Sequence, residues 1–290
     1  MARGRLQSLK RFARRRPLAI VGGAILALLV FFALAADWLA PGDPTLVEVR
    51  LQLCEPSSQH LLGCDENGRD VLTLIIYGSR VALAVGLTSV LVSMTCGVLL
   101  GATAGFFRGW TDEVVMRVAD ICFAFPGILL AILIIFLTQN PSVMSVVLAL
   151  SATGWASYAR LVRGEVLRER ELTYVEAARA LGLPSRRIVV RYILPNVMAP
   201  LSVQATFGVA GAILAESSLS FLGLGPSMSA FWGVSWGALL DQGASYFLLT
   251  PHLAIAPGVA IMLAVLGINF VGDALRDELD PRLRGQIGGP

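Results

Sequence analysis

The chain has 290 residues, of which 56% are hydrophobic and 15% are charged, and its formal net charge at pH 7 is +3. An ordinary soluble domain carries about 25% charged residues, so this composition excludes that class. The sequence therefore predicts an all-α integral membrane protein.

Six stretches are long and apolar enough to cross a bilayer, which takes about 20 mostly apolar residues in a helix. Because no other part of the chain has this character, we expect six transmembrane helices. In chain order they are 18–36, 81–107, 121–138, 142–159, 197–215 and 253–271.

Basic residues predict the orientation, because loops on the cytoplasmic side of the membrane collect Lys and Arg. Residues 1–17 hold seven basic side chains and no acidic one, so we place them inside. Residues 37–80, with seven acids against three arginines, then form a periplasmic loop. Residues 81–275 form the membrane core, and the tail 276–290 is cytoplasmic, as the N-terminus is.

A cleaved signal peptide is the alternative for the start of the chain, because the sequence Ala33-Leu34-Ala35 has a small-x-small form after a basic segment. The apolar run is longer than the usual 7–15 residues of such a peptide, so we favour a retained helix. Cleavage would leave the topology downstream unchanged.

The cysteines contain no C-x-x-C pair, which argues against a metal centre. Cys54 and Cys64 share the outer loop, where a disulfide and two free thiols are equally compatible with the sequence. Cys96 and Cys122 lie in predicted spans, and we interpret them as small apolar packing residues.

The end of the outer loop superficially resembles a calcium-binding loop, because Asp65, Asn67 and Asp70 surround Gly68. The distal bidentate glutamate of such loops is missing. We therefore interpret this stretch as a turn followed by a helix that Asp70 caps.

The second and third spans carry packing signals. Gly97, Gly101 and Gly105 recur every four residues and predict a close helix contact, within the chain or with a partner subunit. Arg117 and Asp120 stand three residues apart and predict a local ion pair. Pro126 should bend its helix, because proline removes a backbone donor.

The long loop at 160–195 is polar and basic, with eight arginines and four glutamates between 160 and 191. Its pattern predicts an amphipathic helix over 171–181, ended by Gly182 at a C-cap that needs positive φ. Ser185 is expected to cap a second helix. Without further information, such a segment is typical of a basic helix resting on anionic lipid.

Glu176-Ala177-Ala178, then Gly182, then Leu194-Pro195 resembles the EAA loop of bacterial ABC importer permeases. Tyr192 departs from that pattern, which usually has an aliphatic residue there. The stretches LLGCDENGRDVLTLIIYGSR, ESSLSFLGLG, FWGVSWGALL and NFVGDALRDELDPRL extend the resemblance, with Cys64 where Thr is usual. They are most similar to the C-type membrane subunit of the dipeptide, oligopeptide and nickel permease branch.

The resemblance implies a type I ABC importer (MetI-like) permease fold in the bacterial inner membrane, with a coupling helix in loop 160–195 that docks on an ATPase. Glu176, Ala177, Ala178, Gly182, Leu194 and Pro195 would then couple the permease to ATP hydrolysis. It also implies a second permease subunit as heterodimer partner, two ABC ATPase subunits, a solute-binding protein and surrounding lipid. Nucleic acid is not expected as a partner.

The cargo implied by this branch is a di- or oligopeptide, with nickel or another small solute as the alternative. The chain contains no G-x-x-x-x-G-K-[ST] phosphate loop, so ATP hydrolysis is expected in partner subunits and this chain is not expected to be an enzyme. No cofactor is expected, and no substrate site is assigned. Glu216 and Asp273 are the ionisable residues nearest membrane depth. We expect Glu216 to face the pathway or a docked binding protein, and Asp273 to act as a cap or to pair with Arg276.

Two other classes remain open. A secondary transporter would need no ATPase, but usually carries coupling acids or broken helices at the membrane midplane. A membrane-embedded hydrolase would need a nucleophile beside a base, yet His60 and His252 have no G-x-S-x-G elbow to accompany them. We consider the hydrolase the least favoured class.

Overall fold

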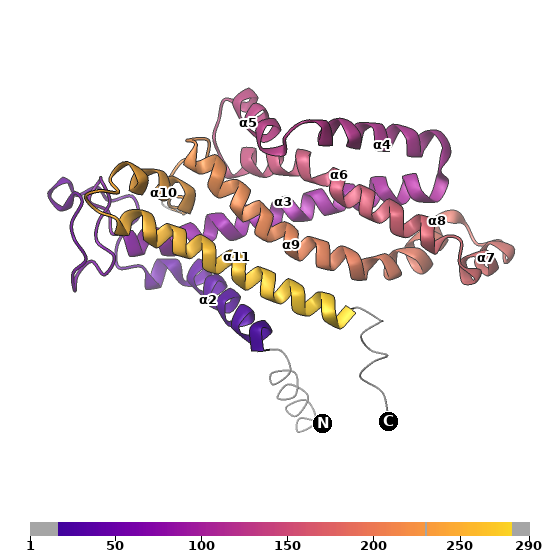
Figure 1. Ribbon diagram of the computed structural model, residues 1–290, viewed down its shortest axis with the longest axis horizontal. Helices are drawn as coiled ribbons and strands as arrows, with labels where there is room; N and C mark the ends of the chain where they lie inside the picture. The colour runs from indigo at the N-terminus through magenta and orange to yellow at the C-terminus, as the bar shows by residue number, and fades with distance from the viewer. Residues whose placement is uncertain (1–16, 230, 280–290) are drawn as a thin grey trace, which may run out of the picture.

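A computed structural model describes residues 17–229 and 231–279, and that part of the chain is a bundle of helices (Figure 1). The basic segment 1–16 and the tail from 280, for which a cytoplasmic position is predicted, lie outside the described residues. The helices are α2 (Pro17–Leu39), α3 (Val71–Phe107), α4 (Gly109–Ala124), α5 (Gly127–Thr138), α6 (Val143–Glu169), α7 (Thr173–Ala180), α8 (Ser185–Ile188), α9 (Leu194–Phe221), α10 (Trp236–Ser245) and α11 (His252–Leu279), with a 3-10 turn at Val49–Leu51 and a π-helical turn at Val189–Ile193.

By length and apolar character, four continuous helices could cross a membrane: α2, α3, the run Ser185–Phe221 that ends in α9, and α11. Helices α4 and α5 make a fifth candidate only as a pair, bent by 93° at Phe125 and Pro126. These criteria pick out five of the six predicted spans, when the bent pair is taken as one span. Helix α6, which holds the predicted fourth span, has the length, but its second half carries Arg160, Arg163 and several further charges.

The bend at Pro126 confirms the expected break in the third span. Phe125 is extended and Pro126 precedes the first turn of α5, so the two helices share no backbone hydrogen bond across the break.

The small-x-small sequence at Ala33 lies inside the continuous helix α2, which packs on α3 and α11.

Helices α3 and α6 pack very closely along a long stretch, and glycines of α3 make this close packing possible. A Cβ at Gly97 would collide with Tyr158, one at Gly101 with the carbonyl of Ala159, and one at Gly105 would press on Val166. The predicted glycine contact is confirmed, and it lies within this chain.

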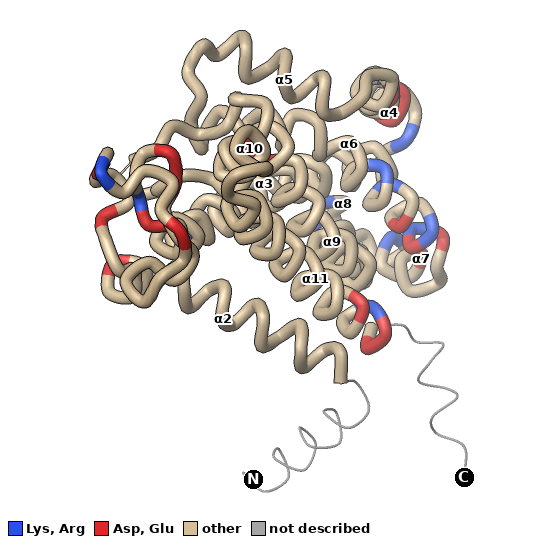
Figure 2. The backbone as a smooth tube through the Cα atoms, turned by 60° about the vertical axis from the view of Figure 1, so that its left-hand side comes forward, with Lys and Arg blue, Asp and Glu red and all other residues tan. Residues whose placement is uncertain are grey.

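Charged residues gather toward the two ends of the bundle and leave the middle largely free of them (Figure 2). At one end lie the loop 40–70 and α10, and at the other lie α4, α7 and the end of α6 (Figures 1 and 2). This separation is what a bilayer around the middle of the helices requires.

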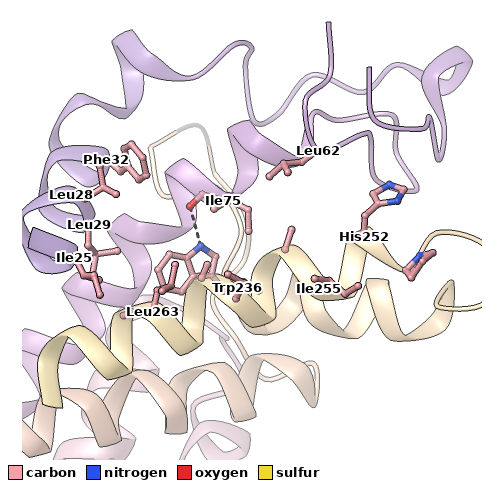
Figure 3. A pocket seen from close by; sticks show the side chains of 15 residues that line it. Ile25, Leu28, Leu29, Phe32, Leu62, Ile75, Trp236, His252, Ile255 and Leu263 are labelled. Atoms are coloured by element: carbon pink, nitrogen blue, oxygen red, sulfur yellow. Dashed lines mark hydrogen bonds between the residues drawn. The ribbon is translucent and has the colours of Figure 1, made fainter. Parts of the chain in front are cut away.

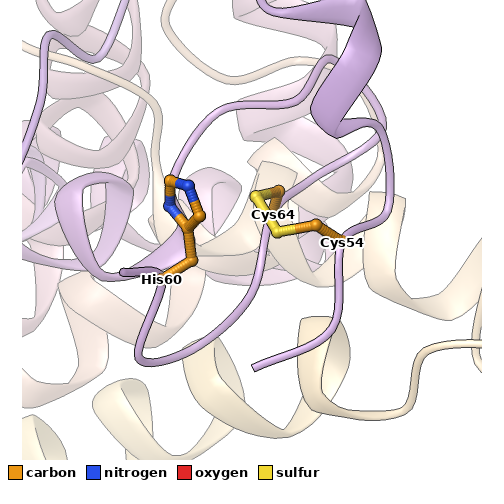
Figure 4. Close-up of side chains that lie close together, drawn as sticks. All are labelled: Cys54, His60 and Cys64. Atoms are coloured by element: carbon orange, nitrogen blue, oxygen red, sulfur yellow. A yellow bond between two sulfur atoms is a disulfide. The ribbon is translucent and has the colours of Figure 1, made fainter. Parts of the chain in front are cut away.

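The loop between α2 and α3 is closed by a disulfide between Cys54 and Cys64, which resolves the alternative left open by the sequence (Figure 4). His60 lies beside the two sulfurs, but sulfurs bonded to each other are not thiolate ligands. Asp65 is buried and its carboxylate binds Arg69, with a distance of 2.7 Å from Nε to Oδ2, so this segment is not a calcium loop. Asp70 caps α3 as predicted, accepting from the Thr73 amide at 2.7 Å.

Arg80 fastens the disulfide end of the bundle. Its guanidinium donates to Asp37 at 2.8 Å and to the carbonyls of Ala33 and Phe231 at 2.7 and 3.1 Å, and it stacks on the Tyr77 ring. Every group that this nearly buried cation touches is an acceptor or an aromatic face, so its desolvation is compensated. One side chain thereby joins α2, α3 and the loop before α10.

The predicted pair of Arg117 with Asp120 is wrong. Asp120 instead accepts from Arg160 of α6, with a distance of 2.8 Å between Nη2 and Oδ1. Close by, Arg163 of α6 binds Asp112 of α4, with Nη2 to Oδ2 at 2.7 Å. The spacing along one helix suggested a local partner, but α6 brings two arginines to the same face of α4.

We expect Gly101→Val to destabilise the bundle by about 1 to 3 kcal/mol, because the new side chain would force α3 away from the backbone of Ala159. The measurement is the unfolding midpoint of the detergent-purified chain. Gly164→Val in α6 is the matched control, since a Cβ there meets open space. Equal midpoints for the two variants would contradict the importance of this contact.

Candidate functional site

Helices α7 and α8 project from one end of the bundle, opposite α10 and the disulfide-closed loop (Figure 1). They belong to loop 160–195, which links α6 to α9. The loop has the exposed position that a docking element needs.

Two buried side chains hold α7 to the bundle. Val175 and Ala178 lie in a hydrophobic cluster with Val162 and Val166 of α6 and Ile188 of α8. After Ala180 the chain turns: Gly182 has φ +76°, and its amide donates to the carbonyl of Arg179 at 2.9 Å. The predicted positive φ at Gly182 is therefore confirmed, although Leu181 is the C-cap residue and Gly182 follows it.

The structure corrects two details of the predicted loop. The amphipathic helix expected over 171–181 is shorter, because α7 covers only Thr173–Ala180 and leaves Leu181 81% exposed. Ser185 is the first residue of α8, makes no side-chain capping bond, and follows Pro184 at the N-cap. From there the chain runs through α8 and the π-helical turn directly into α9.

The predicted coupling residues divide into two groups. Glu176, Ala177 and Gly182 are exposed, together with the neighbouring Leu181. Ala178 is buried, and Leu194 is half-buried where α9 begins. Pro195 is exposed in the first turn of α9, directly after the π-helical turn. The first group offers a surface, and the buried members hold that surface in place.

A polar network that sequence reasoning missed joins the loop to both long helices that flank it. Glu169, at the end of α6, accepts from the Tyr174 hydroxyl at 2.5 Å and from the Asn196 amide at 3.2 Å. Asn196, in the first turn of α9, also donates to the Tyr174 hydroxyl at 2.9 Å and to the carbonyl of Tyr192 at 3.0 Å. Burial and the bond to Glu169 raise the pKa of Tyr174, so this hydroxyl stays a donor.

A second attachment reaches the end of α3. Arg170 donates to the carbonyls of Phe106 at 2.6 Å and Gly105 at 3.3 Å, which are among the unpaired carbonyls at the C-terminus of that helix. Arg179 of α7 lies over the Phe106 ring, 5.4 Å from its centre. The loop is thus bound to α3, α6 and α9 at once, so a force on it would reach all three helices.

Glu216 does not face a pathway or a docked protein. It is buried in α9, and accepts from the hydroxyl of Ser220 at 2.7 Å. Asp273 of α11 is exposed and lines a shallow pocket with Pro17 and Leu18 of α2; within the described residues it makes no ion pair with Arg276. Neither acid contributes to the projecting loop.

A cavity of about 550 Å³ also lies away from this loop. It is an apolar groove between α2 and α11, near the disulfide end, where Trp236 donates to the carbonyl of Ile75 (Figure 3). Its walls carry almost no polar groups that could orient a polar ligand, so we do not assign a site to it.

Comparison with protein families gives two matches. Residues 97–285 match the model of the binding-protein-dependent transport system inner membrane component. Residues 6–56 match the N-terminal TM domain of oligopeptide transport permease C.

Among curated proteins, the chain is 41% identical over 278 residues to the glutathione transport system permease protein of Pectobacterium atrosepticum, covering 95% of this chain and 90% of that one. It is 43% identical to a putative peptide transport system permease protein of Brucella suis, covering 95% and 91%. It is 38% identical to the dipeptide transport system permease protein of Alkalihalophilus pseudofirmus, covering 93% and 88%.

Among solved structures, the chain resembles one from an inward-facing methionine ABC transporter with a TM-score of 0.59. The sequence identity is 20%, and the match covers 72% of this chain and 97% of that one. At this identity the likeness concerns the fold, and it confirms the expected MetI-like arrangement.

We expect Tyr174→Phe to loosen α7, because it removes the hydroxyl that Glu169 and Asn196 share. Backbone hydrogen exchange within α7 should rise by roughly ten-fold, equivalent to about 1.4 kcal/mol. Tyr192→Phe is the control, because Tyr192 joins the network through its carbonyl. Unchanged exchange in Tyr174→Phe would show that the apolar cluster alone holds the helix.

Proposed function

This chain belongs to the family of binding-protein-dependent transport system inner membrane components and is a permease subunit of an ABC importer; we propose that it imports short peptides and that loop 160–195 couples it to ATP hydrolysis. The chain is not itself the enzyme, because ATP hydrolysis belongs to separate subunits. The observation that carries the cargo is the set of relatives at 38 to 43% identity, which are named for glutathione, peptide and dipeptide transport.

The proposed complex contains this chain, a second permease subunit as a heterodimer partner, two ABC ATPases and a solute-binding protein outside. The α7 end faces the cytoplasm, with both termini on that side, and the loop 40–70 faces the periplasm. The disulfide between Cys54 and Cys64 supports this orientation, because disulfides persist in the periplasm and are rare in the cytosol. The basic loop at the other end agrees with it.

The coupling surface consists of Glu176, Ala177, Leu181 and Gly182. The small Ala177 lets a partner approach the helix closely, Glu176 offers a charged contact, and the exposed Leu181 fits an apolar pocket. Ala178, Leu194 and Pro195 hold this surface in place where α7 and the start of α9 join the bundle.

The mechanism is a change between two states. Closure of the ATPases displaces α7, and the attachments of Glu169, Tyr174, Asn196 and Arg170 pass that displacement to α3, α6 and α9. The helices then exchange outward for inward access. Nucleotide biases this equilibrium from one end, and the loaded binding protein biases it from the other.

We expect Leu181→Glu to reduce co-purification of the ATPase subunits by about ten-fold, because the substitution puts a charge where an apolar contact is proposed. The folded chain should tolerate this change, since Leu181 is exposed. Leu248→Glu is the matched control: Leu248 is 97% exposed and lies between α10 and α11, at the opposite end. Equal recovery of the ATPases with both variants would contradict docking at α7.

We expect Gly182→Val to reduce ATP-dependent uptake of a labelled dipeptide to roughly a tenth, with normal amounts of protein in the membrane. A β-branched residue at φ +76° costs about 1 to 3 kcal/mol and would displace the end of α7. Gly182→Asn should keep most of the uptake, because asparagine tolerates this conformation and the site has open space.

The same assay tests the cargo. Proteoliposomes of the whole complex are supplied in parallel with labelled dipeptide, glutathione and Ni²⁺, each with its binding protein. Uptake of Ni²⁺ alone would replace the proposed peptide cargo with the nickel alternative. Uptake that needs no ATPase subunit would instead favour a secondary transporter.

A further inference from the structure

A second cavity, of about 200 Å³, lies between α3, α6 and α9 at mid-length. It is lined by Ser89 at the midpoint of α3, by Ser157 and Tyr158 near that of α6, and by Gly208 near that of α9. Because the charged groups collect at the two ends of these helices, the cavity lies at the level of the bilayer centre.

The chemistry of this cavity is polar and uncharged. Ser89, Ser93, Ser157 and Tyr158 supply hydroxyls, Gln204 supplies an amide, and the other lining residues are small or aliphatic. Such groups are costly at membrane depth unless each has a partner, and they therefore mark functional positions.

The Ser89 hydroxyl gives the most direct sign of a missing ligand. Ser89 is 2% exposed, and within the described part of the chain its Oγ has no hydrogen-bond partner. The Tyr158 side chain is also buried, and its hydroxyl lies so close to Gly208 that a Cβ at that position would collide with it. Glycine at this point makes room for the hydroxyl beside α9.

The cavity opens onto the surface between α6 and α9. Gln204 and Gly211 of α9 are exposed, and with Gly208 and Ala215 they share one face of that helix. An exposed amide at this depth is not compatible with contact to lipid chains, so this face lies against water or another polar surface in the membrane.

We propose that this cavity is a peptide-binding section of the translocation pathway, in which the hydroxyls and the Gln204 amide bind the C=O and N–H groups of peptide bonds. The proposal rests on the proposed function as a peptide importer. Neutral donors and acceptors match a peptide bond whatever side chains flank it. Because no charge is present, binding is weak enough for release, as transport requires.

The lining residues also argue against the metal ion as cargo at this site. Nickel favours imidazole, thiolate and carboxylate ligands. The residues that line the cavity include no histidine, cysteine, aspartate or glutamate. The chemistry of the cavity is that of an amide binder.

Thiol labelling in the assembled importer tests the proposal. In proteoliposomes of the whole complex, Cys96→Ser and Cys122→Ser remove the free thiols, and the disulfide of Cys54 stays intact. Ser93→Cys then places a thiol in the cavity, and Leu91→Cys places one on the exposed face of α3, two residues away. The probe is a small, charged methanethiosulfonate, applied during ATP turnover.

We expect Ser93→Cys to be labelled at least ~10-fold faster than Leu91→Cys, because thiols react as thiolates, which form in water and not in lipid. A transported dipeptide should slow the labelling of Ser93→Cys only. Equal rates at the two positions, in a complex that still imports peptide, would overturn the site and leave the importer function standing. Labelling of Ser93→Cys without protection, in a parent complex that imports no peptide, would overturn the cargo.

Substitution of the amide gives a second measurement that does not depend on a new cysteine. Gln204→Leu keeps the size and removes the hydrogen bonds, and it should lower the rate of peptide uptake at low peptide concentration by ~10-fold. Gln204→Asn should restore part of that loss. Full uptake by Gln204→Leu would overturn the role of the amide.

Discussion

The backbone contact between α3 and α6 is the constraint on which the rest of the structure depends. Gly97, Gly101 and Gly105 let the two helices approach until backbone and Cβ atoms touch. Because this contact runs along the C-terminal half of α3, it fixes where α6 ends. Glu169 and Arg170 stand at that end, and Arg170 donates to the carbonyl of Gly105, so the attachment of the projecting loop depends directly on this contact.

The sequence predicts local features of the backbone better than it predicts contacts between helices. The positive φ of Gly182 could be predicted because it is a local requirement, and Asp70 could be assigned to an N-cap for a similarly local reason. The Arg117 and Asp120 pair failed because three-residue spacing says nothing about a third residue on another helix, and Arg160 is such a residue. Local rules hold until tertiary packing supplies a better partner.

The network of Glu169, Tyr174 and Asn196 also shows the limit of local rules, because it is a tertiary contact that no local pattern predicts. Each residue has an unremarkable local explanation: a last-turn acid, an aromatic residue in a short helix, and an asparagine after a proline. Their 27-residue span along the chain hides a cluster in which the bonds among the three side chains are 3.2 Å or shorter. The one sequence signal for this network is a polar residue, Asn196, at the start of an apolar run.

The two polar regions of the molecule differ in a way that fits a transporter. At the ends, Arg80, Arg163 and Arg170 make multiple bonds that are costly to break, and they hold helices together through any movement. At mid-length, the hydroxyls around Ser89 are neutral and partly unpaired, so they can exchange partners at little cost. A permease needs strong attachments between helices where its partners move it, and weak, reversible contacts where cargo passes. The charged and neutral polar groups of this chain are distributed accordingly.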